Sequence, residues 1–503
     1  MPTLKELISA GELIRDHRPW PRVLVEASGW NAAAGQLAAG RLSLSALWGE
    51  ADTVHMALVD GQAGDVGVLS LACPGGHYPS VAQMHPPALR LERAIRDLFG
   101  LEPTDLPDRR PWLDHGRWGI RHPLGASEPA AESSRYRFLP VEGESLHQIP
   151  VGPVHAGIIE PGHFRFTASG ETVVRLEERL GYTHKGIESL MTGADLERGA
   201  RLAGRISGDS TVACAFAFAR AVESALGCEV PLRAIWLRAL MAELERVANH
   251  LGDIGAICND AAFALMHSHC GILREYVLRT ADACFGHRLM RDCIVPGGVG
   301  VEFTSQGLQQ IRALVERLQH TFPALIDLYE NTASLQDRTV GAGIVQSSLV
   351  HEYAAGGYVG RASGRTFDAR RLPGYPPYDG LRFDVPVQEE GDVNARVWIR
   401  IREVEQSLAL IGGIIDRLPD GPCRTALTPA VGLREGVALV EGFRGDVLVW
   451  LRLDGDQRIE RCHVRDPSWF QWPLLEAAIE GNIVADFPLC NKSFNCSYSG
   501  HDV

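Results

Sequence analysis

The feature that most constrains the fold is a stripe of apolar residues near the middle of the chain. Its members are Leu240, Leu244, Val247, Leu251 and Ile254, which follow one another at alternating steps of four and three residues. This spacing places all five side chains on one face of an α-helix. An isolated helix cannot bury such a face, so the stripe predicts a bundle of long helices at the centre of the fold.

The N-terminal part of the chain carries a different pattern. Residues 53–59 and 66–71 form short segments separated by turns, which indicates strands, and residues 87–100 have the spacing of an amphipathic helix. This mixture predicts a small α+β domain built around a sheet. A stretch rich in Pro, Asp, Arg and Gly, clearest over 101–131, then interrupts the pattern and indicates a linker.

The rest of the chain combines helices with two hairpins. Strand-like segments flank a Ser169-Gly170 turn within 163–176 and an Asp454-Gly-Asp456 turn within 447–464. We therefore predict an α+β fold, with a mainly helical second domain that carries peripheral β-hairpins. The predicted boundaries are 1–110 for the α+β domain, 111–148 for the linker and 149–503 for the helical domain.

Composition and charge exclude several classes of protein. Hydrophobic residues make up 45% of the 503 residues and charged residues 22%, which are ordinary globular values. No apolar run approaches the roughly 20 residues that a membrane span needs, so we expect no direct membrane span. The net charge of −13 disfavours binding to nucleic acid or anionic lipid. The N-terminus lacks the apolar core of a signal peptide, which predicts a cytoplasmic protein.

The cysteines do not form a recognisable metal motif. There are 11 of them, an odd number, and no two have Cys-x-x-Cys spacing. This pattern argues against a disulfide framework and against an iron–sulfur or zinc site held by this chain. We expect most of the cysteines to be buried small hydrophobes. There is also no Gly-rich phosphate loop after a strand, which argues against direct contact with NAD.

Seven short motifs between residues 149 and 503 occur in the order seen in one known family. They are Gly152-Pro-Val-His155, Glu160-Pro-Gly-His163, Leu180 to Glu188, Glu243 to His250, Pro296-Gly-Gly-Val299, Asp337 to Gly343, and Arg361 to Gly364 with Asp368-Ala-Arg370. On these motifs the chain resembles the large subunit of NiFe-hydrogenases of the group 4, or formate hydrogenlyase, type, and through it the 49 kDa quinone-site subunit of complex I. Residues 88–100 resemble the end of the 30 kDa subunit of complex I, which some related proteins carry fused ahead of the large subunit.

The resemblance also identifies the positions at which that family binds nickel and iron through two Cys-x-x-Cys pairs. Here Ser207 and Ser210 occupy the first pair of positions, and Ser497 and Gly500 the second, while Cys496 is one residue out of register. A serine hydroxyl is a hard, neutral donor, whereas these metals need soft, charged thiolates. We therefore predict that the metal ligands have been lost and that the chain binds no metal.

Other site residues follow from the same resemblance. His184, Lys185 and Arg288 match positions near a 4Fe-4S cluster that is held by the neighbouring iron–sulfur small subunit. Lys185 keeps a positive charge there but lacks the planar fork of arginine. A cation beside such a cluster raises its potential. We expect this chain to bind no cofactor of its own, with a quinone as the candidate acceptor.

Five residues are candidates for proton or substrate chemistry. Glu160 matches the hydrogenase pattern and would carry protons if burial raised its pKa, although a solvent-exposed carboxylate at a hairpin edge is an equal alternative. The other four are expected to face the former metal cavity, where titratable groups could move protons. They are Asp209, Arg361, Asp368 and His501.

Three functions remain open at this stage. The leading hypothesis is a subunit that couples electron transfer from the iron–sulfur small subunit to a quinone-like acceptor, to proton movement, or to both. It would sit on the cytoplasmic face of the inner membrane, attached through membrane antiporter-like subunits. The second hypothesis is a scaffold with no substrate of its own. The third, and weakest, is a working hydrogenase with unusual nickel ligands.

Overall fold

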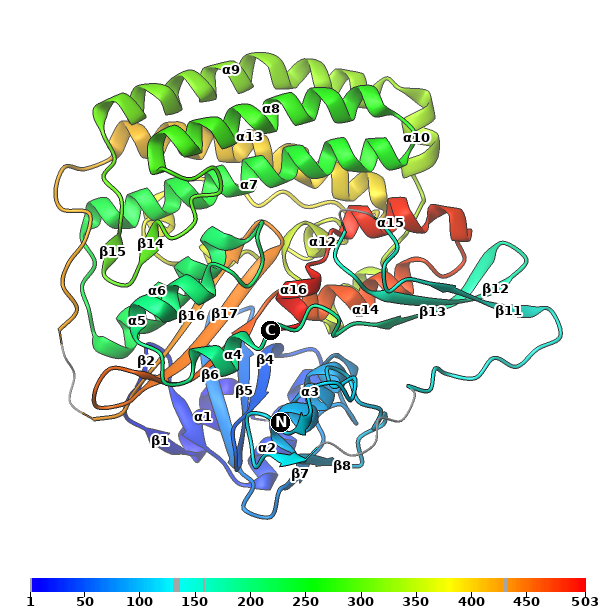
Figure 1. Ribbon diagram of the computed structural model, residues 1–503, viewed down its shortest axis with the longest axis vertical. Helices are drawn as coiled ribbons and strands as arrows, with labels where there is room; N and C mark the ends of the chain where they lie inside the picture. Colours follow the sequence, from blue (N-terminus) through cyan, green and yellow to red (C-terminus); the bar gives the residue numbers. More distant parts are fainter. Residues whose placement is uncertain (1, 130–135, 157–158, 429–431) are drawn as a thin grey trace.

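The computed structural model describes residues 2–129, 136–156, 159–428 and 432–503. Four long helices lie side by side at one end of the molecule (Figure 1). All five apolar residues of the central stripe are on α7 and are 0% exposed. The predicted helix bundle is therefore confirmed. Its helices are α7 (Leu232–Asp260), α8 (Ala264–Phe285), α9 (Ser305–Glu330) and α13 (Val393–Arg417).

The N-terminal part folds around a five-stranded sheet at the opposite end of the molecule (Figure 1). The strand order is β1-β3-β6-β5-β4, and helices α2 (Ala27–Ala38) and α3 (Leu89–Phe99) accompany it. The two strands and the helix that were predicted for this region correspond to β5, β6 and α3. The strands are β1 (Glu12–Ile14), β3 (Arg22–Leu24), β4 (Ser43–Gly49), β5 (Thr53–Val59) and β6 (Val66–Ala72).

A second sheet lies between the first sheet and the helices. Its order is β18-β17-β16-β2, so the N-terminal strand β2 pairs in parallel with a strand from the end of the chain. Trp48 of the first sheet packs against Trp450 of the second, with ring centroids 5.6 Å apart, and α6 (Thr211–Leu226) packs on β16 and β17. The strands are β2 (His17–Arg18), β16 (Arg434–Gly442), β17 (Gly445–Leu453) and β18 (Ile459–Arg465).

The first predicted hairpin belongs to a three-stranded sheet that extends to one side (Figure 1). Its strands β11 (Leu146–Val151), β12 (His163–Ser169) and β13 (Thr172–Arg179) are all antiparallel. The end of the chain packs beside it. That part consists of α14 (Ser468–Ala478), α15 (Phe487–Phe494) and α16 (Tyr498–His501).

The remaining elements are short and connect these layers. The helices are α1 (Leu4–Ala10), α4 (Ile187–Met191), α5 (Leu196–Ala203), α10 (Ala333–Thr339), α11 (Ser347–Glu352) and α12 (Gly357–Arg361). The strands are β7 (His77–Pro79), β8 (Glu102–Thr104), β9 (Ile120–Arg121), β10 (Glu128–Pro129), β14 (Ile294–Val295) and β15 (Gly298–Val299). Single turns of other helix types occur at Pro86–Ala88, Arg370–Gly374, Tyr378–Gly380 and Val484–Asp486. Helices and strands together confirm the α+β class.

The start of the predicted linker is held firmly by the first sheet's helix. Trp112 and Leu113 are 1% exposed, and the Asp97 carboxylate of α3 accepts hydrogen bonds from their backbone N–H groups at 2.6 and 2.7 Å. The domain boundaries themselves stay a prediction. Nine of the 11 cysteines are buried, as expected for small hydrophobes. Among the helices in the described ranges, none is long and apolar enough to cross a membrane.

Candidate functional site

The residues at the former ligand positions lie where two distant segments meet. Ser207 and Ser210 precede α6, and Ser497 is the N-cap of α16. The beginning of α6 is fixed by Glu245 of α7, whose carboxyl accepts hydrogen bonds from the N–H groups of Val212 and Ala213 at 2.7 and 3.1 Å. Burial raises the pKa of Glu245 to about 8. The segment that carries the first two serines is thereby attached to the helix bundle.

The structure brings Ser207 and Ser497 into direct contact. Their Oγ atoms are 2.8 Å apart, and the two residues are 3% and 4% exposed. Ser497 Oγ also accepts a hydrogen bond from the Gly500 N–H at 2.9 Å, while the Ser497 N–H donates to Ser468 Oγ at 2.8 Å. Two former ligand positions that are 290 residues apart in the sequence therefore share one buried polar site.

An ion pair completes this site. The Arg444 guanidinium, from the turn between β16 and β17, donates to both oxygens of Asp209 at 2.8 and 2.5 Å and to Ser210 Oγ at 3.0 Å. Ser207 Oγ donates to Asp209 Oδ1 at 2.8 Å. Burial alone would raise the pKa of Asp209, but the charge and hydrogen bonds of Arg444 lower it to about 2. We call Ser207, Asp209, Ser210, Arg444 and Ser497 the serine cluster.

Asp466 borders the serine cluster and was not singled out from the sequence. It is 1% exposed, and its Oδ1 accepts a hydrogen bond from the Ser468 N–H at 2.8 Å. Its Oδ2 has no hydrogen-bond partner among the described residues. A Cβ atom on Gly500 would lie 2.6 Å from this oxygen and 2.9 Å from Ser497 Oγ. The carboxylate therefore occupies the space that a side chain at position 500 would need.

These residues do not fit a four-thiolate nickel–iron centre. The positions offer three hydroxyls and a glycine, and the Arg444 guanidinium contacts two of the residues that would face a metal. A guanidinium so close would repel a metal cation. Among the described residues, no group of three or more His, Cys, Asp and Glu side chains could hold a metal ion. Cys496 is buried, and its Sγ faces Gln471 Oε1 at 4.0 Å.

His501 and Asp502 anchor the end of the chain. His501 Nε2 accepts a hydrogen bond from the Trp112 indole N–H at 3.1 Å, and its Nδ1 contacts Asp502 Oδ1 at 2.7 Å. Its ring also stacks on Trp469, with centroids 4.0 Å apart, and burial lowers its pKa. The Asp502 carboxylate accepts hydrogen bonds from the N–H groups of Gly181 and Thr183. These contacts show His501 in a docking role, and its predicted proton-transfer role stays a prediction.

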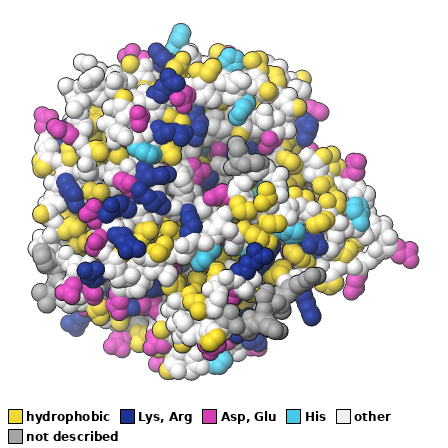
Figure 2. Space-filling view, viewed as in Figure 1, with side chains coloured by type: hydrophobic (Ala, Val, Ile, Leu, Met, Phe, Trp, Pro, Cys, Tyr) yellow, Lys and Arg dark blue, Asp and Glu magenta, His cyan; other side chains and the backbone are white. Residues whose placement is uncertain are grey.

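The residues expected near a partner's cluster fall into two groups. The Lys185 ammonium donates to the backbone carbonyls of Arg205 and Ile206, both at 2.7 Å, immediately before Ser207. His184 Nδ1 contacts the Asp502 carbonyl at 3.0 Å. Arg288 follows the end of α8 and lines a small cleft together with Asp209 of the serine cluster. Figure 2 shows Lys and Arg side chains gathered on this side of the molecule, over the region of α6, β14 and β15.

Arg361 and Asp368 belong to a second buried polar region, which shares no residue with the serine cluster. Arg361 contacts Glu403 at 2.7 Å and Glu441 at 2.9 Å, and Asp368 contacts Arg370 at 2.7 Å. Glu403 is shared with His250 and Arg246, and Arg370 with Glu243. All of these side chains are at most 2% exposed. We call this set the ionic network: Glu243, Arg246, His250, Arg361, Asp368, Arg370, Glu403 and Glu441.

The turn between β16 and β17 joins the two regions. Glu441, the last but one residue of β16, belongs to the ionic network, and Arg444 belongs to the serine cluster. Between them, the carbonyl of Gly442 accepts a hydrogen bond from Arg246 at 3.2 Å. In the sequence, Arg444 is a charged residue in a tight turn between two apolar strands. Such a position normally faces solvent, so the sequence alone does not indicate that Arg444 is buried.

Glu160 lies at the rim of the site. Glu160 is exposed, and its Oε2 accepts a hydrogen bond from the Ser499 N–H at 3.0 Å. The burial on which its role as a proton carrier depended is therefore absent. That contact still ties the loop before β12 to the C-terminal segment, and the proton-carrying role stays a prediction.

Comparisons with known proteins agree with this architecture. Residues 53–134 match the family model "Respiratory-chain NADH dehydrogenase, 30 Kd subunit", and residues 261–435 and 427–502 match "Respiratory-chain NADH dehydrogenase, 49 Kd subunit". Formate hydrogenlyase subunit 5 of Escherichia coli (strain K12) is 30% identical over 436 residues, which cover 84% of this chain and 77% of that protein. Carbon monoxide-induced hydrogenase of Rhodospirillum rubrum is 32% identical, and the aligned residues cover 70% of this chain and 98% of that protein.

A solved structure shares the fold as well. It is the structure of the membrane-bound sulfane sulfur reductase, an archaeal respiratory membrane complex; one chain of it superposes with a TM-score of 0.68 at 27% identity, covering 73% of this chain and 100% of that chain. Fold and relatives together define a class of large subunits found in respiratory membrane complexes. The chain belongs to the family of group 4 hydrogenase large subunits and complex I 49 kDa subunits, with a 30 kDa-like region ahead of it.

Proposed function

We propose that this chain is a large subunit of a membrane-associated redox complex in which nickel–iron chemistry has been lost. Electrons would pass from a 4Fe-4S cluster on an iron–sulfur small subunit to a quinone-like acceptor, with coupled proton movement. The observation that carries the proposal is the serine cluster. At the four positions where the resemblance places the metal ligands, this chain has three hydroxyls and a glycine, and the Asp209–Arg444 ion pair contacts two of the hydroxyls.

The chemistry of the cluster suits an organic acceptor better than a metal. Arg444 places guanidinium N–H groups beside Asp209 and Ser210, and Asp466 Oδ2 is an acceptor that no described residue uses. The oxygens of a quinone accept hydrogen bonds from N–H donors, and the hydroxyls of the quinol formed by reduction donate to an acceptor. Asp209 stays ionised because Arg444 lowers its pKa, so it would hold Arg444 in position and leave proton donation to other groups.

The proposed partners follow from the family and the surface. The basic face over α6, β14 and β15 (Figure 2) is the candidate contact for the iron–sulfur small subunit, because Lys185 and Arg288 both belong to the segments near it. Membrane antiporter-like subunits would hold the complex peripherally on the cytoplasmic face of the inner membrane. The solved structure that shares the fold is that of a membrane-bound respiratory complex, which supports this placement.

A scaffold without a substrate is the second candidate, favoured by a specific observation. The polar atoms of His501 and Asp502 form hydrogen bonds that fix the end of the chain, and the hydroxyls of Ser207 and Ser497 are hydrogen-bonded to each other. A site that served only assembly would contain contacts of this type.

The two functions separate in one experiment on the purified complex. Dithionite-reduced complex would be mixed with decylubiquinone, and the rate of quinol formation compared for wild type, Asp209→Asn and Glu197→Gln. Glu197 is a matched control, because its side chain is 78% exposed and pairs only with Arg201 of the same helix. We expect Asp209→Asn to lower the rate by at least about tenfold, or about 1.4 kcal/mol in the barrier, with assembly intact. An assembled Asp209→Asn complex with the wild-type rate would contradict the proposal and leave the scaffold.

A further inference from the structure

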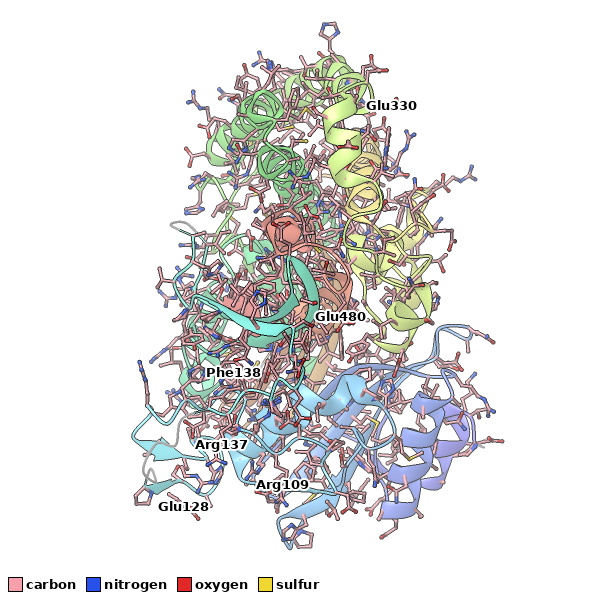
Figure 3. All side chains as sticks on the ribbon, turned by 90° about the vertical axis from the view of Figure 1, so that its right-hand side faces the viewer. Arg109, Glu128, Arg137, Phe138, Glu330 and Glu480 are labelled. Atoms are coloured by element: carbon pink, nitrogen blue, oxygen red, sulfur yellow. The ribbon has the colours of Figure 1, made fainter. Side chains whose placement is uncertain are left out.

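A cavity of about 580 Å³ lies outside the serine cluster, where the N-terminal part of the chain meets the larger part. Its walls come from α3, β13 and α14, through Arg90, Glu178 and Glu476 respectively. In Figure 3, Glu480 from the end of this wall lies above Phe138 and Arg137, while Glu330 is at the far end of the bundle. A space of this size takes several water molecules.

Two carboxylates on this wall share a single cation. Arg90 Nη1 is 3.1 Å from Glu178 Oε2, and Arg90 Nη2 is 2.7 Å from Glu476 Oε1. The Glu178 N–H also donates to Glu476 Oε1 at 2.8 Å. Glu178 is 0% exposed and Glu476 is 23% exposed, so one member is buried and the other opens toward the cavity. Glu178 Oε1 has no hydrogen-bond partner among the described residues.

With both carboxylates ionised, Glu178, Glu476 and Arg90 together would carry a net charge of −1. The neighbouring charged residues form other contacts and do not pair with these carboxylates. Arg110 is paired with Glu177 at 2.5 Å, and Arg93 with Asp108 at 3.1 Å. Arg175 donates to the backbone carbonyls of Leu139 and Pro140. The other titratable groups that face the pair are Glu480, Tyr353, Tyr136 and Cys496. None of these four supplies a positive charge, so among the described residues Arg90 is the cation in contact with the pair.

Two carboxylates that meet one guanidinium, one of them fully buried, are most stable when the pair holds one proton. Burial raises the pKa of Glu178 well above its usual value, and the charge of Glu476 raises it further, while Arg90 lowers it. Burial likewise raises the pKa of Glu476. Both carboxylates raise the pKa of Arg90, which therefore stays charged. The free oxygen Glu178 Oε1 is the natural place for the shared proton.

The pair adjoins the segment that carries Ser497. Cys496 immediately precedes that serine, and burial raises the pKa of its thiol; the negative charges of Glu178 and Asp466 raise it further. Cys496 therefore lies within electrostatic reach of both the carboxyl pair and the free carboxylate at the serine cluster. The Arg90 guanidinium also lies 4.5 Å from the centre of the Trp112 ring, whose N–H binds His501.

We infer that Glu178 and Glu476, bridged by Arg90, form a proton-carrying carboxyl pair that exchanges one shared proton between water in the cavity and the serine cluster. A hydronium ion in the cavity gives its proton to the pair and leaves as water, and the pair later gives that proton to the Asp466 carboxylate at the serine cluster. The use of the proton rests on the proposed function. That the pair holds one proton rests on the placement of two carboxylates beside one guanidinium and on the burial of Glu178.

The sharing is tested by infrared difference spectroscopy of the intact purified complex, titrated from acid to alkaline pH. A protonated carboxyl group has a carbonyl stretching band that a carboxylate lacks. We expect the carbonyl absorption at neutral pH to contain one component, beside that of Glu245, that disappears in both E178Q and E476Q. It should remain in E330Q, a control whose side chain is exposed and remote from the cavity. Two variants are used because the buried Glu178 could affect folding, whereas Glu476 is partly exposed.

The use of the proton is tested by the rate of decylubiquinone reduction as a function of pH. We expect E476Q to lower the rate by about tenfold at neutral pH and to remove the fall in rate that accompanies deprotonation of the pair. Carbonyl absorption at neutral pH that is the same in wild type, E178Q and E476Q would overturn the inference. If the band behaves as expected but E476Q has the wild-type rate and pH profile, the proton-carrying role fails while the shared proton stands. If the wild-type complex does not reduce decylubiquinone at all, the proposed function is refuted instead.

Discussion

The serine cluster and the ionic network are both buried and polar, yet their charges are arranged in opposite ways. In the ionic network, every carboxylate contacts at least two cationic groups or hydrogen-bond donors, as Glu403 does with Arg246, His250 and Arg361. At the serine cluster, most contacts are made by hydroxyls, and Asp466 Oδ2 remains free among the described residues. The carboxylates of the network are all paired and hold α7, α13 and β16 together, while His250 Nδ1 has no hydrogen-bond partner among the described residues. The cluster keeps acceptor capacity that a bound molecule could use.

Removal of one carboxylate from the ionic network should have the largest effect. Glu403→Ala leaves Arg246, His250 and Arg361 without their shared acceptor inside the core, and breaking a buried ion pair in this way costs about 3–5 kcal/mol. We expect a large drop in the thermal unfolding midpoint of the purified complex or failure to assemble. Glu405→Ala on the same helix is the control, because Glu405 is 42% exposed and its pair with Arg402 is worth under about 1 kcal/mol. Equal shifts for the two variants would show that the network does not hold the fold.

The pH dependence of Glu245 should have the next largest effect, because this residue attaches the serine cluster to the bundle. Its pKa is about 8 in the folded chain against an ordinary 4.5, so its contribution to stability is complete below pH 4.5 and is lost as the pH rises through 8. Asp209 raises this pKa and Arg246 lowers it. We expect wild type to lose roughly 2–4 kcal/mol more than Glu245→Gln between pH 6 and pH 9, followed by denaturant unfolding. Parallel stability curves for the two proteins would contradict this assignment.

Asp466→Asn tests whether the free acceptor at the serine cluster is used. The substitution replaces a carboxylate oxygen by an amide and should lower decylubiquinone reduction by about tenfold, while unfolding changes by about 1 kcal/mol or less. The matched control is Asp486→Asn, which loses only a partly exposed contact to Arg338 at 3.0 Å. Unchanged quinone reduction by Asp466→Asn would place the acceptor elsewhere and make the two buried regions functionally alike.

Ser207→Ala should have the smallest effect. Asp209 keeps its two contacts with Arg444, and Ser497 keeps its hydrogen bond from Gly500, so the lost hydroxyl accounts for about 1 kcal/mol of stability. We expect a shift of a few degrees in the unfolding midpoint. Ser268→Ala is the control, because that exposed hydroxyl donates only within its own helix. A shift as large as that of Glu403→Ala would mean that the cluster, too, is a structural core.

Much of the fold could be predicted because its signals are local. The stripe from Leu240 to Ile254 and the Ser169-Gly170 turn each specify an element within a few residues, and α7 and the β12–β13 hairpin confirm them. The burial of β16 and β17 between α6 and the first sheet has no such signal. It depends on Trp48 and Trp450, which are far apart in the sequence and meet only in the folded chain.

The site was harder to predict for the same reason. The positions of Ser207 and Ser497 came from the family resemblance, and the structure places them 2.8 Å apart. Arg444 and Asp466 were missed because their roles arise only when the β16–β17 turn and the start of α14 reach the end of the chain. His501 was chosen for its nearness to Ser497 in sequence, but Trp112 and Trp469 fix its ring by tertiary contacts.

The most direct test of the central claim is a paired measurement on the purified complex. Nickel is determined by elemental analysis, and hydrogen uptake is compared with decylubiquinone reduction in the same preparation. The serine cluster predicts nickel far below one atom per complex, no hydrogen uptake, and quinone reduction that depends on Asp209. One nickel atom per complex together with hydrogen uptake would contradict the account and restore the chain to the working hydrogenases.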